Sequence, residues 1–333
     1  MTAVDECGPA MLQNPKHDGL LLIKCLSLLL MVAASPLSAQ VVRPVPVNIF
    51  GDGNPGNGVE DSRRPVKPSP RKGGTVNDRR LNAGTITCDG KFRCTAMVVD
   101  TREISGDLKG VVLVTAAHVL YNLDRNRLFK RCKFYFMGWR RDAGYRARID
   151  LRKVRMGSFH PRQSTRAKEF GEGDWAFLYL RKPWRKFDPD QSIPLRVFKF
   201  SQSESYRQTG GEFRLLAFDS AAGFISESRN CTVVESIGDD LGRGAWDGQL
   251  LDDCDSSDGA SGGGIMAVMD QAQYLIGIRT GSHWNDQLFP PGQFPSGPPD
   301  GSAWDRRSNT NFGRAIDDFL IHELNQLIQS HGG

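Results

Sequence analysis

The sequence predicts an all-β fold of antiparallel barrels or sandwiches, followed by one helix near the C-terminus. Two observations predict it. After residue 84, short apolar runs rich in Val, Phe and Leu alternate with turn residues, and no long helical pattern separates them. In the final segment, NFGRAIDDFLIHELNQLI, apolar residues recur every three to four positions, which indicates an amphipathic helix. Strands without intervening helices favour antiparallel sheets over a parallel α/β sheet.

The elements follow one another along the chain. The strand-like runs are CTAMVVD (94–100), VVLVTAAHVL (111–120), KFYFMG (133–138), ARIDLRKV (147–154), DWAFLYL (174–180), EFRLLAF (212–218), CTVVES (231–236), GGIMAVM (263–269) and YLIGIRTG (274–281). The apolar face of the predicted helix consists of Phe312, Ile316, Phe319, Leu320, Leu324 and Leu327.

The composition is that of an ordinary soluble globular protein. The chain has 333 residues, 39% of them hydrophobic and 24% charged, which is enough for one large domain or two. Its 43 basic and 38 acidic residues give a formal net charge of +5, spread along the chain. So small an excess does not favour a nucleic-acid partner, and we expect none.

The N-terminus has the pattern of a secretory signal over residues 1–39. Lys16 and Lys24 precede an apolar run, Cys25–Ala34, and the small-residue stretch SPLSAQ follows, with cleavage expected near Ala39. The run is shorter than the roughly 20 apolar residues of a membrane span. We therefore expect a secreted or periplasmic protein without stable membrane association after cleavage. An uncleaved anchor or a buried helix is the alternative.

Residues 40–84 are rich in Pro, Gly and Arg and contain few clustered apolar residues. Such a composition cannot form a core, so we interpret this segment as a pro-segment or flexible linker. Its two dibasic sites, Arg63-Arg64 and Arg79-Arg80, are either processing points or solvated charge.

Three short segments together predict an activated nucleophile. His118 ends an apolar run, Asp174 begins another, and Ser261 lies among four glycines in CDSSDGASGGGI. A serine hydroxyl needs a base to take its proton; histidine suits that role, and a buried aspartate orients the imidazole. Glycine allows positive φ and close approach, so the N–H groups of Gly259 and Ser261 can form an oxyanion hole.

In these segments the chain resembles the trypsin/chymotrypsin superfamily of serine proteases. The resemblance rests on Thr115-Ala-Ala-His118, on Asp174 before its apolar strand, and on Gly259-Ala-Ser261-Gly-Gly263, in the order His, Asp, Ser. It covers roughly residues 85–325.

The resemblance implies two six-stranded antiparallel β-barrels, 85–195 and 196–333, the second including the C-terminal helix. It places the active site between them and implies hydrolysis of protein or peptide substrates through an acyl-enzyme on Ser261, without a cofactor or metal. A monomer is expected. Trypsin-like zymogens carry an aspartate where this chain has Ala260, so maturation would not use that salt bridge. The segment around Ser261 and Cys94-Thr-Ala96 resembles the bacterial V8-like (glutamyl endopeptidase) branch.

Substrate preference stays open. In this superfamily the residue six before the serine lies at the base of the primary pocket, and here it is Asp255, which favours basic side chains. Arg279 falls where glutamate-specific members carry a pocket histidine, so it could attract an acidic side chain or neutralise Asp255. Ser282 is a third substrate-binding candidate.

Five cysteines remain after the predicted signal, and in an exported protein they are expected to form disulfides. Cys231 and Cys254 flank the segment that leads to the serine motif and form the first pair that we expect. The other pair is either Cys88 with Cys94 or Cys94 with Cys132. No cysteine spacing indicates a zinc site.

Two other functions fit parts of the pattern. The serine motif also satisfies the G-x-S-x-G elbow of α/β-hydrolases, but that elbow needs a helix after the serine, whereas a strand-like run follows here. A protease-like fold that has lost activity and serves as a binding module is the second alternative. Loss of activity is usually accompanied by replacement of a triad residue, and all three are present.

Overall fold

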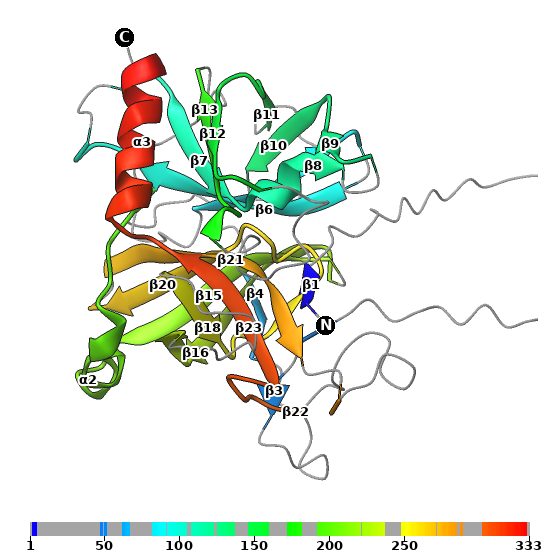
Figure 1. Cartoon of the computed structure of the whole chain (residues 1–333). Coiled ribbons are helices and arrows are strands. Elements are labelled where there is room, and N and C mark those ends of the chain that lie inside the picture. Colours follow the sequence, from blue (N-terminus) through cyan, green and yellow to red (C-terminus); the bar gives the residue numbers. More distant parts are fainter. Residues whose placement is uncertain are drawn as a thin grey trace, which may run out of the picture.

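The computed structural model describes residues 2–4, 47–48, 50–51, 62–66, 82–90, 92–104, 108–122, 125–136, 146–159, 172–181, 192–220, 222–236, 248–270, 272–284, 287–288 and 302–331. Apart from the short strand β1 (Thr2–Val4), the predicted signal segment lies outside these residues. Two mainly antiparallel sheets lie one above the other, and a long C-terminal helix runs beside the upper one (Figure 1). The predicted all-β fold with a C-terminal helix is confirmed at this level.

The first sheet contains eight strands, in the order β11-β10-β5-β6-β7-β13-β12, with β14 parallel to β6. They are β5 (Ala83–Cys88), β6 (Phe92–Asp100), β7 (Val111–Thr115), β10 (Cys132–Phe136), β11 (Arg146–Ile149), β12 (Val154–Met156), β13 (Ala176–Leu180) and β14 (Ile193–Pro194). The short helix η2 (Ala117–Leu120) follows β7, and β8 (Tyr121–Asn122) pairs with β9 (Arg127–Leu128).

The second sheet contains nine strands, in the order β17-β18-β23-β21-β20-β15-β16-β4, with β1 on the edge of β21. They include β4 (Arg64–Pro65), β15 (Glu212–Asp219), β16 (Phe224–Cys231), β17 (Val233–Glu235), β18 (Gln249–Asp252), β20 (Gly264–Met269), β21 (Ala272–Trp284) and β23 (Asn309–Ala315). The short pairs are β2 (Val47–Asn48) with β19 (Ser256–Ser257) and β3 (Phe50–Gly51) with β22 (Ser302–Ala303). The short helices η4 (Phe200–Gln202) and α2 (Ser203–Gln208) precede β15. These sheets exceed the six strands expected for each barrel because short strands such as β4 and β14 extend them.

Apolar residues from alternate positions of the first sheet form two cores. Leu113 and Leu178 face a core that is formed by the first sheet and its connecting segments. Val112, Val114 and Phe177 face a second core, to which residues of both sheets contribute. Strands β7 and β13 are therefore buried on both faces, which explains their uninterrupted apolar sequences. A third core lies within the second sheet.

The C-terminal helix α3 (Asp318–His331) starts later than the sequence pattern suggests. Phe312, predicted on the helix, lies in strand β23, because β18 and β21 both pair with that strand and satisfy its backbone. Ile316 lies between strand and helix, and Phe319, predicted on the apolar face, is 53% exposed. Leu320, Leu324 and Leu327 are buried as predicted.

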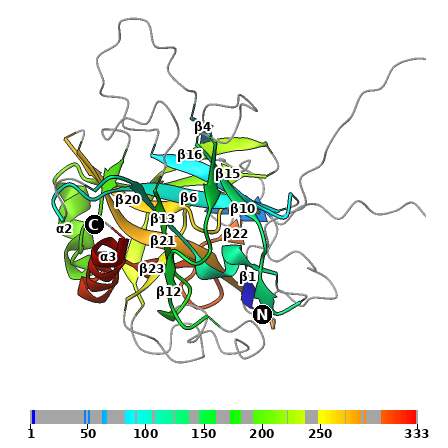
Figure 2. The ribbon, with the colours of Figure 1, turned by 90° about the horizontal axis from the view of Figure 1, so that it is seen from above.

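Although α3 follows the second sheet in the chain, it packs on the first (Figure 2). Arg155 of β12 forms an ion pair with Glu323 of α3. The rings of Tyr179 and His331 stack with centroids 5.5 Å apart. The end of the chain thus covers the domain formed by its first half.

Part of the predicted pro-segment or linker, residues 40–84, pairs with the second sheet. The segment 62–66, called here the strap, pairs with β16 through β4. Val66 donates a backbone hydrogen bond to Ile225, and Arg63 lies 3.0 Å from the carboxylate of Asp219. Local composition could not predict this strap because its partners lie more than 150 residues later. Within the described part of the chain, no helix is long and apolar enough to cross a membrane.

Candidate active site

His118 and Asp174 form a buried hydrogen-bonded pair at the edge of the first sheet. Strands β7 and β13 pair with Thr115 opposite Ala176, so the residues that follow β7 meet those that precede β13. Asp174 Oδ2 lies 2.7 Å from His118 Nδ1, and Asp174 Oδ1 accepts the backbone N–H of His118 at 2.8 Å. Both carboxylate oxygens therefore fix the position and ring orientation of one histidine.

The second ring nitrogen of His118, Nε2, is available for proton transfer. Nε2 is buried and forms no hydrogen bond with the described residues. In the neutral tautomer in which Nδ1 donates to Asp174, Nε2 is the nitrogen that can accept a proton. The ring of Phe159 lies 6.1 Å from that of His118 and covers it on one side. The pair can thus accept a proton from a group brought to Nε2.

Ser261 is fully buried in a tight turn between β19 and β20. The turn is closed by backbone hydrogen bonds from Ala260 to Ser257 and from Gly263 to Ala260. Gly262 N–H donates to the carbonyl of Arg279 on the neighbouring strand β21. A strand follows the serine, which excludes the strand–serine–helix arrangement of an α/β-hydrolase elbow.

Thr95 of β6 joins the serine turn to the first sheet. Its backbone N–H donates to the carbonyl of Ser261 at 2.9 Å, and its hydroxyl donates to the carbonyl of Gly259 at 2.8 Å. The same hydroxyl accepts the N–H of Phe218 at 2.8 Å. One threonine therefore fixes the serine turn relative to the first sheet, whose strand β7 leads to His118. The sequence pattern around Thr95 predicts no role for this residue in the site.

Gly262 allows the turn to approach the first sheet closely. Its φ is +78°, and a Cβ at this position would lie 2.0 Å from Thr115 Oγ1 and 2.3 Å from the carbonyl oxygen of Thr95. Thr115 is three residues before His118. The residue after Ser261 therefore packs directly against the strand end that leads to the histidine.

The peptide before Gly259 is oriented by the second sheet. The carbonyl of Asp258 accepts the N–H of Ser220 at 3.0 Å. In a trans peptide the C=O and N–H point in opposite directions, so the N–H of Gly259 points away from Ser220. Gly259 has a φ of +92°, which favours glycine over other residues. This orientation agrees with the expected use of Gly259 as an oxyanion-hole donor, which stays a prediction.

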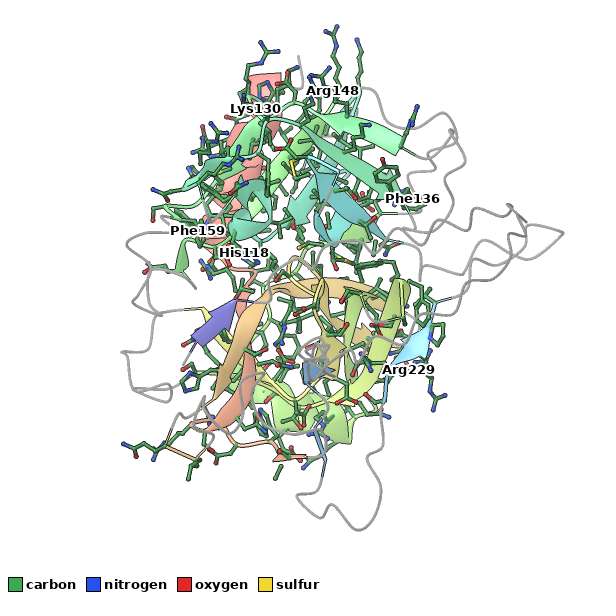
Figure 3. All side chains as sticks on the ribbon, turned by 90° about the vertical axis from the view of Figure 1, so that its right-hand side faces the viewer. His118, Lys130, Phe136, Arg148, Phe159 and Arg229 are labelled. Atoms are coloured by element: carbon green, nitrogen blue, oxygen red, sulfur yellow. A yellow bond between two sulfur atoms is a disulfide. The ribbon has the colours of Figure 1, made fainter. Side chains whose placement is uncertain are left out.

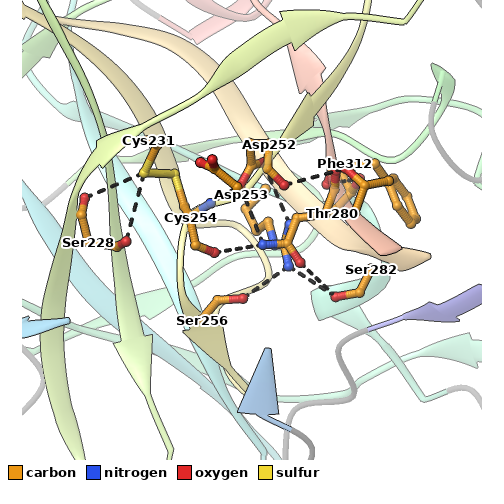
Figure 4. Close-up of polar contacts among 12 residues, drawn as sticks. Ser228, Cys231, Asp252, Asp253, Cys254, Ser256, Thr280, Ser282 and Phe312 are labelled. Atoms are coloured by element: carbon orange, nitrogen blue, oxygen red, sulfur yellow. Dashed lines mark hydrogen bonds and ion pairs between the residues drawn. A yellow bond between two sulfur atoms is a disulfide. The ribbon is translucent and has the colours of Figure 1, made fainter. Parts of the chain in front are cut away.

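Arg279 lies in a polar cage formed by Ser256, Ser282 and Asp252, which are labelled in Figure 4. Its side chain is fully buried; Nη2 donates to the hydroxyls of Ser256 and Ser282 at 3.0 Å, and Nη1 lies 3.6 Å from Asp252. Asn311 continues the cage by accepting a hydrogen bond from Ser282 and donating one to the carbonyl of Cys254. The structure thus brings two predicted substrate-binding residues, Arg279 and Ser282, into contact.

Asp255, the third substrate-binding candidate, is also buried and bound from within the chain. Its Oδ2 accepts the backbone N–H of Ser62, the first residue of the strap, at 2.7 Å. Its own N–H donates to Ser228 Oγ, which lies 2.7 Å from Ser62 Oγ. Asp252 and Ser62 were not singled out in the sequence: Asp252 lies in an unremarkable acidic run, and Ser62 in a segment interpreted as a linker.

Asp253, which lies between Asp252 and Cys254, has a carboxyl group with a raised pKa. Burial raises the pKa of Asp253 to about 6; the hydrogen bonds from Thr232 oppose this shift, and the nearby charges of Asp252 and Asp255 add to it. The backbone N–H of Thr232 donates to Asp253 Oδ1. No cluster of three His, Cys, Asp or Glu residues suited to a metal occurs among the described residues.

Two disulfides join pairs of residues within the described part of the chain. Cys231 is bonded to Cys254, the pair that the sequence favours, which ties β16 to the segment before the serine turn. Cys88 is bonded to Cys132, which differs from both pairings considered for Cys94. The reason is register: Cys88 and Cys132 lie directly opposite each other on β5 and β10, with Cα atoms 4.1 Å apart.

Comparisons with known proteins show a likeness to solved structures but not to family models or curated proteins. No family model matches the chain, and no curated protein matches it. A similar solved structure is that of a thermostable serine protease, AL20, from an extremophilic microorganism. It shares 14% sequence identity, covers 74% of this chain and 96% of its own, and superposes with a TM-score of 0.46. At this level of likeness, the site has to be interpreted from its own geometry.

Proposed function

We propose that this protein is an exported serine endopeptidase in which Ser261, His118 and Asp174 form the catalytic triad. The observation that carries the proposal is the buried His118–Asp174 pair, whose Nε2 forms no hydrogen bond with the described residues. The serine turn, which Thr95 and the Gly262–Thr115 contact hold against the same strands, supplies the nucleophile. The two disulfides agree with export to an oxidising compartment.

The proposed reaction is acyl transfer. His118 Nε2 takes the proton of Ser261 Oγ as that oxygen attacks the substrate carbonyl, and Asp174 stabilises the imidazolium. The N–H groups of Gly259 and Ser261 stabilise the oxyanion. His118 then gives its proton to the leaving amine, and water releases the acyl group by the same steps in reverse. All of these groups belong to the chain itself.

For the primary pocket we propose that Asp255, Arg279 and Ser282 act on the substrate side chain. Asp255 and Arg279 carry opposite charges, and each is already bound, to the strap and to the cage respectively. A peptide library with every residue at the position before the cleaved bond decides between them. A preference for Glu or Asp assigns the pocket to Arg279, and a preference for Lys or Arg assigns it to Asp255.

Covalent labelling tests the proposal. The full chain without residues 1–39 is treated with a fluorophosphonate, and the adduct is mapped by mass spectrometry. We expect modification of Ser261, which the variant His118→Ala loses and Ser257→Ala, a nearby serine of the same segment, retains. With a peptide substrate, Asp174→Asn is expected to lower kcat by about 10⁴ because the imidazole adopts the wrong tautomer.

The alternative is a protease-like binding module without activity. It predicts a folded protein in which Ser261 is not labelled above the level of other serines. Removal of the whole segment 40–84 is unsuitable as a test for a latent zymogen, because the strap pairs with β16 and binds Asp255. Cleavage at Arg63-Arg64 by an added protease, followed by labelling, separates a zymogen from a binding module.

A further inference from the structure

The end of the first sheet that lies away from His118 carries a cavity with basic walls. Its volume is about 510 Å³, and four cationic side chains line it: Arg148 from β11, Arg152 and Lys153 from the following turn, and Arg181 after β13. Figure 3 shows Arg148 at the outer end of this sheet and His118 at the end that faces the second sheet. The cavity is therefore separate from the candidate active site.

The cavity keeps a large net positive charge after internal pairing. Its carboxylate, Asp150, accepts two hydrogen bonds from Arg152 at 3.0 Å, so these two charges compensate each other. These hydrogen bonds lower the pKa of Asp150 to about 2. No ion pair joins Arg148, Lys153 or Arg181 to a carboxylate within the described residues. Three uncompensated charges thus surround one cavity.

Strand pairing adds further positive charge beside the cavity. Lys133 of β10 lies directly opposite Arg148 of β11, and both side chains are exposed. Like charges in directly opposed positions destabilise a sheet. With Arg146, two residues before Arg148 on the same exposed face, they form what we call the basic row (Lys133, Arg146, Arg148). On a surface exposed only to solvent this repulsion between like charges is not compensated, whereas a bound anion would compensate it.

The floor of the cavity is rigid. Tyr179 is only 4% exposed, and its ring is stacked on His331 of α3 at 5.5 Å. The ammonium group of Lys153 lies 5.5 Å from the centre of the same ring, within range of a cation–π interaction. Lys153 is therefore positioned before a ligand arrives, which lowers the entropy lost on binding.

We propose that the cavity and the basic row bind the sulfate or phosphate groups of a linear polyanion that contains no nucleobases. Arginine guanidinium groups match tetrahedral oxyanions through paired hydrogen bonds, and Arg148 and Arg181 supply them from two segments. Arg146 and Arg148 stand about 7 Å apart along β11, so successive anionic groups of a flexible chain can follow the row.

Two other classes of anionic partner fit less well. Single-stranded nucleic acid is bound through bases stacked on exposed aromatic rings, and the Tyr179 ring in this cavity is buried. Insertion into an anionic membrane needs exposed apolar side chains. The large hydrophobic residues exposed in the described structure are Val197, Leu288 and Phe319, and none of them lines the cavity.

The test measures binding of dextran sulfate and of inorganic polyphosphate to the full chain carrying Ser261→Ala, which prevents self-cleavage. The variant pair Arg148→Gln and Arg181→Gln removes two cavity charges. The control pair Arg125→Gln and Arg207→Gln removes two exposed charges elsewhere. We expect the cavity pair to weaken binding by about tenfold or more and to reduce the slope of log K against log salt by about two, one for each lost contact.

The control pair is expected to change affinity less than twofold, and the tighter of the two polymers identifies the anion. Equal losses in both pairs would mean diffuse charge attraction and would overturn the proposal, as would absence of binding to either polymer. Tighter binding to oligothymidylate, or to phosphatidylglycerol vesicles, would replace the proposed ligand with that class. None of these outcomes depends on protease activity, so failure here leaves the proposed function intact.

Discussion

Substitution of Gly262 by alanine is the most direct perturbation of the contact between the serine turn and the first sheet. The new Cβ would lie 2.0 Å from Thr115 Oγ1 and 2.3 Å from the carbonyl oxygen of Thr95. To place this Cβ even 3.0 Å from Thr115 Oγ1, the turn must move by about 1 Å. The backbone carbonyl of Thr95 restricts that movement. Positive φ adds about 1–2 kcal/mol, and overpacking about 1–3 kcal/mol. We expect the free energy of unfolding to fall by about 2–5 kcal/mol.

The matched control is Gly210→Ala. Gly210 has a φ of +88°, close to the +78° of Gly262, but a Cβ there would meet nothing within 4 Å. It therefore isolates the cost of the backbone conformation, about 1–2 kcal/mol. The difference between the two variants in urea unfolding measures the clash alone.

The same pair of variants tests the link between the turn and the proposed chemistry. A displacement of about 1 Å in a reacting group typically lowers the rate about 100-fold. We expect fluorophosphonate labelling of Ser261 to slow by that factor in Gly262→Ala and to stay unchanged in Gly210→Ala. If both variants lose equal stability and both keep the labelling rate, the close approach of Gly262 to Thr115 is not a feature of the folded protein.

Three further predictions concern stability. The raised pKa of Asp253 means that, as the pH rises, the folded state keeps a proton that the unfolded state has already lost. The free energy of unfolding therefore falls by about 3 kcal/mol as the pH rises from 4 to 6. Asp253→Asn should reduce this pH dependence in urea unfolding. Replacing Cys231 and Cys254 by serine opens a loop with a sequence separation of 23 and should lower stability by about 3 kcal/mol. Leu324→Ala on α3 removes a fully buried side chain and should cost about 2–5 kcal/mol by thermal unfolding.

Each of these predictions has its own contrary result. A urea profile of Asp253→Asn that keeps the wild-type slope would show that another group titrates. A reducing agent that changes the stability of the double serine variant as much as that of the native protein would show that the stabilisation comes from other disulfides, such as Cys88–Cys132. A loss of less than 1 kcal/mol in Leu324→Ala would show that this side chain does not hold α3 on the body of the protein.

Much of the fold could be predicted because local pattern decides it. The continuous apolar runs of β7 and β13 predict buried strands, and the structure buries every residue of both. The start of α3 could not be predicted, because the pattern of Phe312 and Ile316 fits either a helix or a strand. The choice is made by pairing with β18 and β21, which the local sequence does not contain.

Part of the candidate site could likewise be predicted from the sequence, and part of it could not. His118 and Asp174 were predicted as partners from residue type and order, and the structure places them 2.7 Å apart. Thr95 could not be found, because its role arises from three backbone partners in distant segments. The contact between Ser62 and Asp255 spans 193 positions, and a composition rich in Pro and Gly gave no reason to expect order there.

The position of α3 also determines when the protein can complete its fold. The helix is made after both sheets, yet Leu320 and Leu324 fill the core beside Phe177 of the first sheet. While the chain is being synthesised, that face of the first sheet emerges from the ribosome well before the 14-residue helix that covers it. The two halves therefore cannot mature one after the other, and a chain that ends before Asp318 exposes apolar surface in its N-terminal half.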